Sequence, residues 1–378
     1  TYTAQSVLPD KFKTLAEYMR DSGYYTSAMG DNFFLHPEYN MDQGFIEYNF
    51  YPRRQMVVDS FAAKVINTLF PGRLSYYIST KELTDLAARW LEENRDSDFF
   101  LWVHYYDPHI PYTPPREYIA KDAVPDGDVG YALTDAGKIR SGHFAPNAAQ
   151  RKWIKELYDA EVRYVDDNIG RLLDALKENS LYKSSLIILT SDHGEEFWDH
   201  GGFEHGHTLY NELLHVPLIV KLPGSHQAKV VDDEVTTQSL MATVLDATHI
   251  RKDSEPPTAE SLVPLITGPE GQYPEEPLVS TGLLYYENRE SVIFDHNKYI
   301  ESLVTGRAEL YDLKSDPHEQ NPLPMSPNRF KTDQAKNILN SHNRESEAVS
   351  KELGVSYSEK VALDKEKTEK LKALNYIQ

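Results

Sequence analysis

The sequence contains no cysteine among its 378 residues. Disulfide bonds and zinc sites built on thiolates are therefore excluded. No apolar run approaches the roughly 20 residues that a membrane-spanning helix needs. The longest runs, 186–189 and 216–220, have the length of buried strands. The chain opens on threonine rather than methionine, so we expect its natural N-terminus upstream. The missing signal peptide therefore says nothing about targeting.

Positive charge is also scarce, because 39 Lys and Arg residues stand against 59 Asp and Glu residues, a formal net charge of −20. This balance disfavours non-specific binding to nucleic acid or to anionic membrane surfaces. An anionic substrate would need a local cationic site, since the overall field repels it. Hydrophobic residues make up 40% of the chain, enough for one large α/β domain with or without a small second one.

The first two thirds of the chain alternate between helix-like and strand-like segments. Strands are expected at residues 24–29, 99–104, 186–190 and 217–222, and helices after Thr14 and at about 81–94 and 151–178. This alternation predicts a mostly parallel sheet covered by helices on both faces. Ligands of such sheets gather beyond the carboxyl ends of the strands. Residues 121–150 show little apolar periodicity and are expected to form a long loop.

The pattern changes after about residue 270. Short strand-like segments separated by turns, at 278–284, 291–295, 298–303 and 308–313, predict a small antiparallel sheet. Residues 333–378 are charged and helix-prone. We therefore predict an α/β catalytic domain over residues 1–270 and a small C-terminal subdomain with a helical tail over residues 271–378.

A polar segment directly follows one of the predicted buried strands, where Asp192 and His193 precede Gly194. A carboxylate and an imidazole side by side at a strand end can turn toward one cation, while the glycine lets the backbone bend away. An Asp-His pair alone is more typical of an ordinary polar turn. The strand before it and the histidines after it favour a metal site.

Further histidines follow in the same loop: His200, His205 and His207. Grouped imidazoles can bind a metal ion or hold an oxyanion, and a solvated loop with ordinary hydrogen bonds explains the pattern equally well. His109 lies between two prolines after another predicted strand, so its imidazole should have a fixed direction. Such a residue suits a general acid, although a proline-rich turn packed against tyrosines is an equally good interpretation.

Adjacent carboxylates at Asp166 and Asp167 fall inside a predicted helix, where neighbouring residues point about 100° apart. We expect one of them to be buried in helix packing and the other to be solvated, with no metal between them.

The order of these segments resembles that of the sulfatases, within the alkaline phosphatase superfamily, along nearly the whole chain. The similar segments, in order, are residues 14–18, 23–26, 41–45, 107–112, 191–195, 205–220, 309–313, 316–319 and 370–376. Each segment is weak alone, but several in register are specific. The resemblance implies an alkaline-phosphatase-like fold, a mostly parallel sheet between helices with a small C-terminal antiparallel sheet.

By this resemblance, Asp192 and His193 would be ligands of a single divalent metal ion. His109 would contact a sulfate ester and help to protonate its leaving oxygen. His205 falls where many family members carry a sulfate-binding Lys or His, and His207 is the alternative for that position. The implied reaction is hydrolysis of a sulfate monoester, either a small molecule or a carbohydrate. Calcium is the family's usual ion, and the Asp-His pair leaves manganese or zinc open.

The sequence departs from the family at the nucleophile. Sulfatases oxidise a Cys or Ser in a C/S-x-P-x-R motif to formylglycine, and they place a metal-binding Asp pair before it. The C/S-x-P-x-R motif does not occur here, and no N-terminal Asp pair follows an apolar strand. We expect both in an upstream segment, and we expect residues 1–378 alone to be inactive.

Two alternatives stay open. One is a phosphoryl-class member of the superfamily, such as a phosphodiesterase, phosphonate hydrolase or phosphoethanolamine transferase. The other is an inactive fragment or binding module. The resemblance is compatible with a periplasmic or secreted protein, while the substrate and the oligomeric state do not follow from the sequence.

Overall fold

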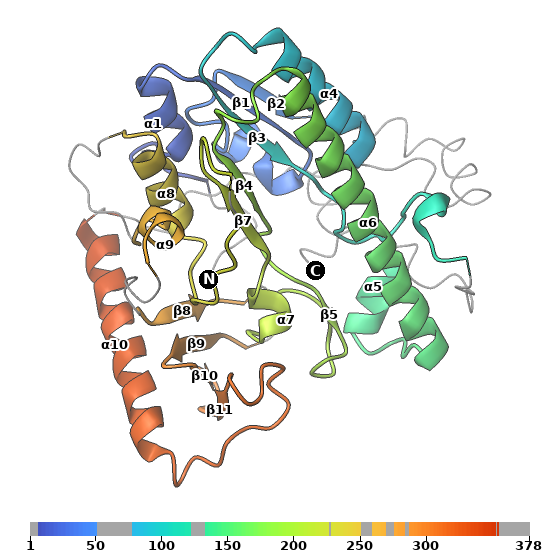
Figure 1. Ribbon diagram of the computed structural model, residues 1–378. Coiled ribbons are helices and arrows are strands. Elements are labelled where there is room, and N and C mark those ends of the chain that lie inside the picture. Colours follow the sequence, from blue (N-terminus) through green and yellow to red (C-terminus); the bar gives the residue numbers. More distant parts are fainter. Residues whose placement is uncertain are drawn as a thin grey trace. The chain divides into compact units, whose positions relative to one another are not determined.

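The computed structural model of the protein describes residues 7–50, 78–121, 133–226, 228–250, 259–269, 276–283, 287–352 and 354. These residues belong to two compact units, of which one ends at Ser185 and the other begins at Leu186. Each unit has its own sheets and helices (Figure 1). The predicted domain boundary near residue 270 is a different division, and it stays a prediction. Within the described residues, no helix is long and apolar enough to span a bilayer.

The N-terminal unit is built on a parallel three-stranded sheet in the order β2-β1-β3. Its strands are β1 (Tyr25–Gly30), β2 (Glu47–Phe50) and β3 (Phe99–His104). The register pairs Gly30 with His104, so the carboxyl ends of β1 and β3 lie at the same edge. A Cβ at Gly30 would lie 3.0 Å from the Cβ of His104, so the close approach of the two strand ends favours glycine there.

Polar caps begin the main helices of this unit. Thr14 caps α1 (Leu15–Asp21), Ser79 caps α4 (Thr80–Glu93) and Asn147 caps α6 (Ala148–Glu178). Each cap is a reciprocal capping box, completed by a Glu or Gln three residues later. Helices α4 and α6 pack side by side (Figure 1). The capping box expected at Thr14 is confirmed, and so are the helices expected at 81–94 and 151–178, within three residues at each end.

Short elements complete the unit: η1 (Phe33–Leu35), η2 (Pro37–Tyr39), η3 (Arg116–Tyr118) and α5 (Leu133–Arg140). Helix α5 lies inside the segment expected to be a long loop, so that expectation is corrected for residues 133–140. Residues 122–132 of the same segment lie outside the described residues.

The buried face of α6 includes two polar residues, Glu161 and Asn168. Oε1 of the buried Glu161 accepts a hydrogen bond from the backbone N–H of Thr113, at 2.5 Å, which offsets part of the cost of burying the carboxylate. Asp166 and Asp167 are both exposed, so the expectation that one of them is buried is wrong. The buried stripe runs through Glu161 and Asn168 and leaves both aspartates on the outer side of the helix.

The C-terminal unit begins with β4 (Ile187–Thr190), which pairs with β7 (Leu218–Lys221) in antiparallel register. The long connection between them contains the two-residue strands β5 (Glu196–Phe197) and β6 (Phe203–Glu204) and the short helix α7 (Asn211–Leu214). Helices α8 (Ser239–Ala247) and α9 (Val263–Thr267) follow.

A four-stranded antiparallel sheet in the order β11-β10-β9-β8 lies in the same unit. Its strands are β8 (Leu278–Thr281), β9 (Arg289–Phe294), β10 (Asn297–Ser302) and β11 (Ala308–Asp312). Helix α10 (Arg329–Glu352) packs along this sheet (Figure 1). The shared core consists of Val292, Phe294, Tyr299, Leu310, Ala335 and Leu339.

The predicted α/β class with a parallel sheet and a small C-terminal antiparallel sheet is confirmed. All four short strands expected after residue 270 are present, and the charged C-terminal segment forms a helix as far as Glu352. Residues 370–376, which resemble a common family ending, lie outside the described residues.

Candidate active site

Asp192 and His193 follow directly after β4, where the backbone leaves the strand. Gly194 makes this turn possible, because a Cβ at that position would overlap the carbonyl oxygen of Glu212. The Oδ2 atom of Asp192 lies 3.8 Å from Nε2 of His193, and the Asp192 side chain is 75% exposed. The Nδ1 atom of His193 lies 2.8 Å from the carbonyl oxygen of Gly194. Since a carbonyl can only accept, Nδ1 carries a proton, and Nε2 is the ring nitrogen that faces Asp192.

His205 lies beside His193, and their rings stack with centroids 4.0 Å apart. Its Nδ1 pairs with Oε1 of Glu195 at 2.9 Å, and both side chains are largely buried. Burial by itself lowers the pKa of His205, but the hydrogen bond to Glu195 and the charges of Glu195, Glu204 and Asp192 outweigh it, so the pKa is raised. The structure therefore brings together three of the predicted site residues, Asp192, His193 and His205.

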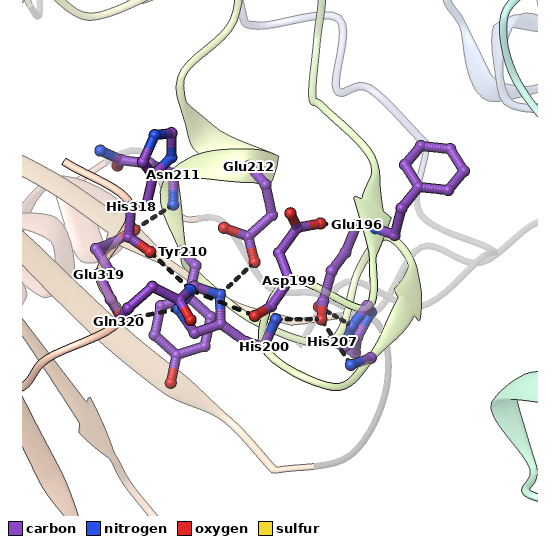
Figure 2. Close-up of polar contacts among 12 residues, drawn as sticks. Glu196, Asp199, His200, His207, Tyr210, Asn211, Glu212, His318, Glu319 and Gln320 are labelled. Atoms are coloured by element: carbon purple, nitrogen blue, oxygen red, sulfur yellow. Dashed lines mark hydrogen bonds and ion pairs between the residues drawn. The ribbon is translucent and has the colours of Figure 1, made fainter. Parts of the chain in front are cut away.

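His207 points in a different direction. Its Nε2 bonds to Oε2 of Glu196 at 2.7 Å, and the Glu196 side chain is fully buried (Figure 2). Oε1 of Glu196 also accepts hydrogen bonds from the backbone N–H groups of His200 and Gly202, at 3.0 and 2.6 Å. Burial raises the pKa of Glu196, but the bonds from His207 and the two amides dominate and lower it. Glu196 thus organises the loop that carries the histidines.

The ring of His200 takes part in neither arrangement, although its backbone N–H binds Glu196. Its Nδ1 faces Oε1 of Glu212 at 2.7 Å, and its Nε2 faces the carbonyl oxygen of Glu319 at 2.8 Å (Figure 2). The ring also stacks on Tyr210, with centroids 3.6 Å apart. Burial lowers the pKa of His200, but the bonds to Glu319 and Glu212 outweigh it, and the pKa is raised.

His109 belongs to the N-terminal unit, in the segment that follows β3. Both flanking X-Pro bonds, Asp107-Pro108 and Ile110-Pro111, are cis. The ring packs on Tyr106, with centroids 4.7 Å apart, and its Nδ1 lies 2.7 Å from the carbonyl oxygen of Ile110. These contacts give the imidazole a definite orientation, as the two prolines predict.

The helices α4 and α6 hold both ends of this segment. Oδ2 of Asp107 accepts a hydrogen bond from the Thr80 hydroxyl at the start of α4, at 2.6 Å. Burial raises the pKa of Asp107, although the bonds from Thr80 oppose the shift. At the other end, Glu161 of α6 binds the backbone of Thr113. The segment that carries His109 is therefore tied to two packed helices.

A divalent cation fits the Asp192–His193 pair in part. The 3.8 Å between the carboxylate and imidazole atoms suits two ligands that each lie about 2.0–2.5 Å from one ion. Over the described ranges, no group of three or more His, Asp or Glu side chains is arranged to hold a metal ion. The pair supplies two ligands, and the described residues do not complete the set.

The sequence patterns did not single out the acidic partners of the histidines. Glu195, Glu196 and Glu212 lie within or close to the histidine-rich loop, and Glu319 lies in the segment that resembles the family's C-terminal motif. The available signal was the concentration of acidic residues around the histidines. It does not reveal which carboxylate meets which imidazole, because that depends on how the loop folds.

Comparisons with known proteins agree with this picture. The family model described as Sulfatase matches residues 1–250. A protein named Sulfatase from Formosa agariphila is 28% identical over 333 residues, and the match covers 81% of this chain and 64% of that protein. The chain therefore spans somewhat less than two thirds of the length of this relative.

Solved structures share the fold at low sequence identity. One, a protein in complex with its substrate D-glucosamine-2-N,6-O-disulfate, has a TM-score of 0.65 and 18% identity, covering 91% of this chain and 84% of that one. Another, a phosphonate monoester hydrolase from Silicibacter pomeroyi, has a TM-score of 0.64 and 16% identity, covering 90% and 80%. The structural neighbours support the alkaline-phosphatase-like fold, and because the family model matches well over half of the sequence, this chain belongs to the sulfatase family.

Proposed function

We propose that the protein hydrolyses sulfate monoesters of small molecules or carbohydrates. The observation that supports this most is the sulfatase match over residues 1–250, which includes Asp192, His193 and His205. These three side chains lie together at the end of β4. A carboxylate and two imidazoles that lie close together can bind a cation and an anionic oxygen. A sulfate monoester carries such anionic oxygens.

In this proposal Asp192 and His193 bind a divalent cation, His193 through Nε2, because its Nδ1 faces the carbonyl oxygen of Gly194. Calcium is the usual ion of the family, and an imidazole ligand is also compatible with manganese or zinc. The bound ion would offset negative charge on the sulfate oxygens. Further ligands would have to come from elsewhere, because this pair supplies only two.

His205 would hold a sulfate oxygen. Its bond to Glu195 fixes the direction of the ring and favours the charged imidazolium, which can donate a hydrogen bond to an anion. His207 is the alternative contact, but its bond to the buried Glu196 supports a role in shaping the loop instead. We therefore place the sulfate contact at His205.

His109 would protonate the leaving oxygen as the ester bond breaks. Its proline-flanked segment, tied to α4 and α6, limits the reorientation that the ring would need. The family resemblance implies formylglycine as the nucleophile, and residues 1–378 contain no C/S-x-P-x-R motif in which it could form. Activity is therefore proposed for the protein together with any residues that flank this chain.

A second candidate is hydrolysis of a phosphonate or phosphate ester. The fold shared with a phosphonate monoester hydrolase, at a TM-score of 0.64, supports this second candidate. Both reactions could use the same cation and imidazoles, because sulfuryl and phosphoryl groups carry similar anionic oxygens.

The test is an assay of the full protein with an aryl sulfate, sulfated sugars, an aryl phosphonate monoester and a phosphodiester. We expect the sulfate esters to show the highest kcat/KM. Asp192→Asn should remove most of the bound metal and reduce turnover by at least about 100-fold. Asp233→Asn, a change at an exposed aspartate of the same unit, is the matched control and should leave both unchanged. Preferred turnover of the phosphonate ester would replace the first candidate with the second.

A further inference from the structure

The loop between β4 and β7 has little regular structure to fix its shape. Its only strand pairing joins the two-residue strands β5 and β6. The helix α7 is a single turn, and it lies directly against the proposed metal-binding pair. The backbone N–H of Gly194 donates to the carbonyl oxygen of Leu213 at 2.9 Å, next to His193 in the chain. The position of His193 therefore depends on the position of α7.

Helix α7 is in turn held by a charged pair from the C-terminal part of the same unit. Lys298 of β10 and Glu319 form an ion pair, Nζ to Oε1, at 2.8 Å, and both side chains are 0% exposed. The Oε2 atom of Glu319 accepts a hydrogen bond from the backbone N–H of Asn211, the first residue of α7, at 2.6 Å. Lys298 also donates to Oδ1 of Asn211, at 2.8 Å. One residue of α7 thus contacts both charges.

Glu319 makes a second connection through its backbone. Its carbonyl oxygen accepts from Nε2 of His200, whose Nδ1 faces Glu212 of α7 (Figure 2). Glu319 has a positive φ of 53°, a conformation that non-glycine residues seldom adopt. The side-chain carboxylate of Glu319 binds Asn211 and its backbone carbonyl binds His200. Glu319 therefore fixes the position of the loop at two places.

A gain in stability alone does not explain the buried ion pair between Lys298 and Glu319. Removing two charges from water is costly, and apolar residues of similar volume are often at least as stabilising in a protein interior. A charged pair does differ from an apolar contact in direction, because each hydrogen bond requires a particular position of its partner. The directional bonds here end on the turn of helix that supports His193.

We propose that Lys298 and Glu319 are positioning residues of the active site. Through Asn211 and α7 they fix the backbone at Gly194, and through His200 they fix the far side of the loop. His193 and His205 are thereby held in their stacked arrangement. This inference rests on the proposed sulfatase function for its catalytic meaning, but the arrangement of the rings can be measured without turnover.

The first measurement is NMR spectroscopy of the full protein labelled at histidine, with the ring signals of His193 and His205 assigned by single substitutions. Glu319→Gln keeps an acceptor for Asn211 but removes the charge. We expect it to shift the ring signals of both histidines. Asn211→Ala should shift them too, since it cuts the contact with Lys298 without burying an unpaired charge. The matched control is Tyr299→Phe, which removes a partly buried hydrogen bond between two residues of β10, Tyr299 and Glu301, and should leave both signals in place.

The second measurement is steady-state kinetics of the same variants on the best sulfate ester. We expect kcat to fall about 10-fold to 100-fold in Glu319→Gln, with a much smaller change in KM, because misplaced catalytic groups affect mainly the reacting state. Tyr299→Phe should keep the wild-type kcat even where its melting temperature falls.

The outcomes separate the two proposals. If Glu319→Gln and Asn211→Ala are folded but leave the ring signals and kcat unchanged, the pair is only structural and the inference is overturned. If Glu319→Gln does not fold, Asn211→Ala decides by the same criteria. If the wild-type protein turns over no sulfate ester, the proposed function fails, while the ring signals still decide whether the pair positions His193 and His205.

Discussion

Replacing Lys298 by methionine removes one half of a fully buried ion pair. Methionine fills a similar volume, but Glu319 keeps its negative charge in a site with no exposure to solvent. Asn211 also loses the donor to its Oδ1 atom. Breaking a buried pair from one side costs about 3–5 kcal/mol. We expect the free energy of unfolding of the C-terminal unit to fall by this amount.

A second change should reverse most of this loss. In the double variant Lys298→Met, Glu319→Gln no charge is buried, and the glutamine still accepts from the backbone of Asn211. Burial lowers the pKa of Lys298 although the Glu319 charge raises it, so the cost of removing this lysine from water outweighs the gain from its partner. The double variant should therefore unfold within about 1–2 kcal/mol of the wild type.

The assay is urea unfolding combined with native-state hydrogen exchange of amides in β9 and β10, which reports the opening free energy of that sheet. Tyr299→Phe serves as the control and should cost only about 0.5–1.5 kcal/mol, as expected for one hydrogen bond that is partly buried. The reasoning is refuted if the double variant is as unstable as Lys298→Met alone. A loss of less than about 1 kcal/mol in the free energy of unfolding of Lys298→Met would also refute it, because leaving a buried carboxylate unpaired should destabilise the protein by more than that.

Three further predictions concern the histidine-rich loop. His205→Ala should lower kcat/KM more than His207→Ala, because the His205 ring lies against the proposed metal pair; the reverse order in steady-state kinetics would move the sulfate contact to His207. The raised pKa of His200 adds stability that is complete below its usual pKa of 6.5 and is lost as the pH rises through the folded-state value. The free energy of unfolding should therefore fall as the pH rises from about 6, and His200→Gln should flatten that dependence in urea titrations, whereas an equal slope in the variant would contradict the assignment. Gly202→Ala should cost about 1–3 kcal/mol, because the added Cβ would overlap the ring of His207; an unchanged melting temperature would show that the loop can move aside.

Local features of the fold were predictable from the sequence because their causes lie within a few residues. Thr14 and Glu17 form the expected capping box, since both partners belong to one turn of helix. The alternation of apolar segments located β3 and α6 because burial imposes a period on nearby positions. Polar members of a buried face were not predictable in this way, and Glu161 is an example. Its buried carboxylate binds the backbone of Thr113, which lies 48 residues away in the chain.

In the candidate site, too, local features were predictable from the sequence and long-range contacts were not. The placement of Asp192 and His193 at the end of β4 followed from the sequence, because a buried strand and the turn after it are adjacent in the chain. The choice between His205 and His207 did not follow. Both lie in one short polar segment, and only the folded loop directs one toward His193 and the other toward the buried Glu196.

By itself, the sequence determined the α/β class, the small C-terminal sheet, the family resemblance and the strand end at which Asp192 and His193 lie. Periodicity, capping and motif order carry that information locally. Only the tertiary structure decided which carboxylate each histidine meets and what supports α7. The contact between Glu319 and Asn211 joins residues 108 positions apart. Its partners can be chosen only when the antiparallel sheet and the histidine-rich loop pack together, because burial is what makes the pairing of these charges necessary.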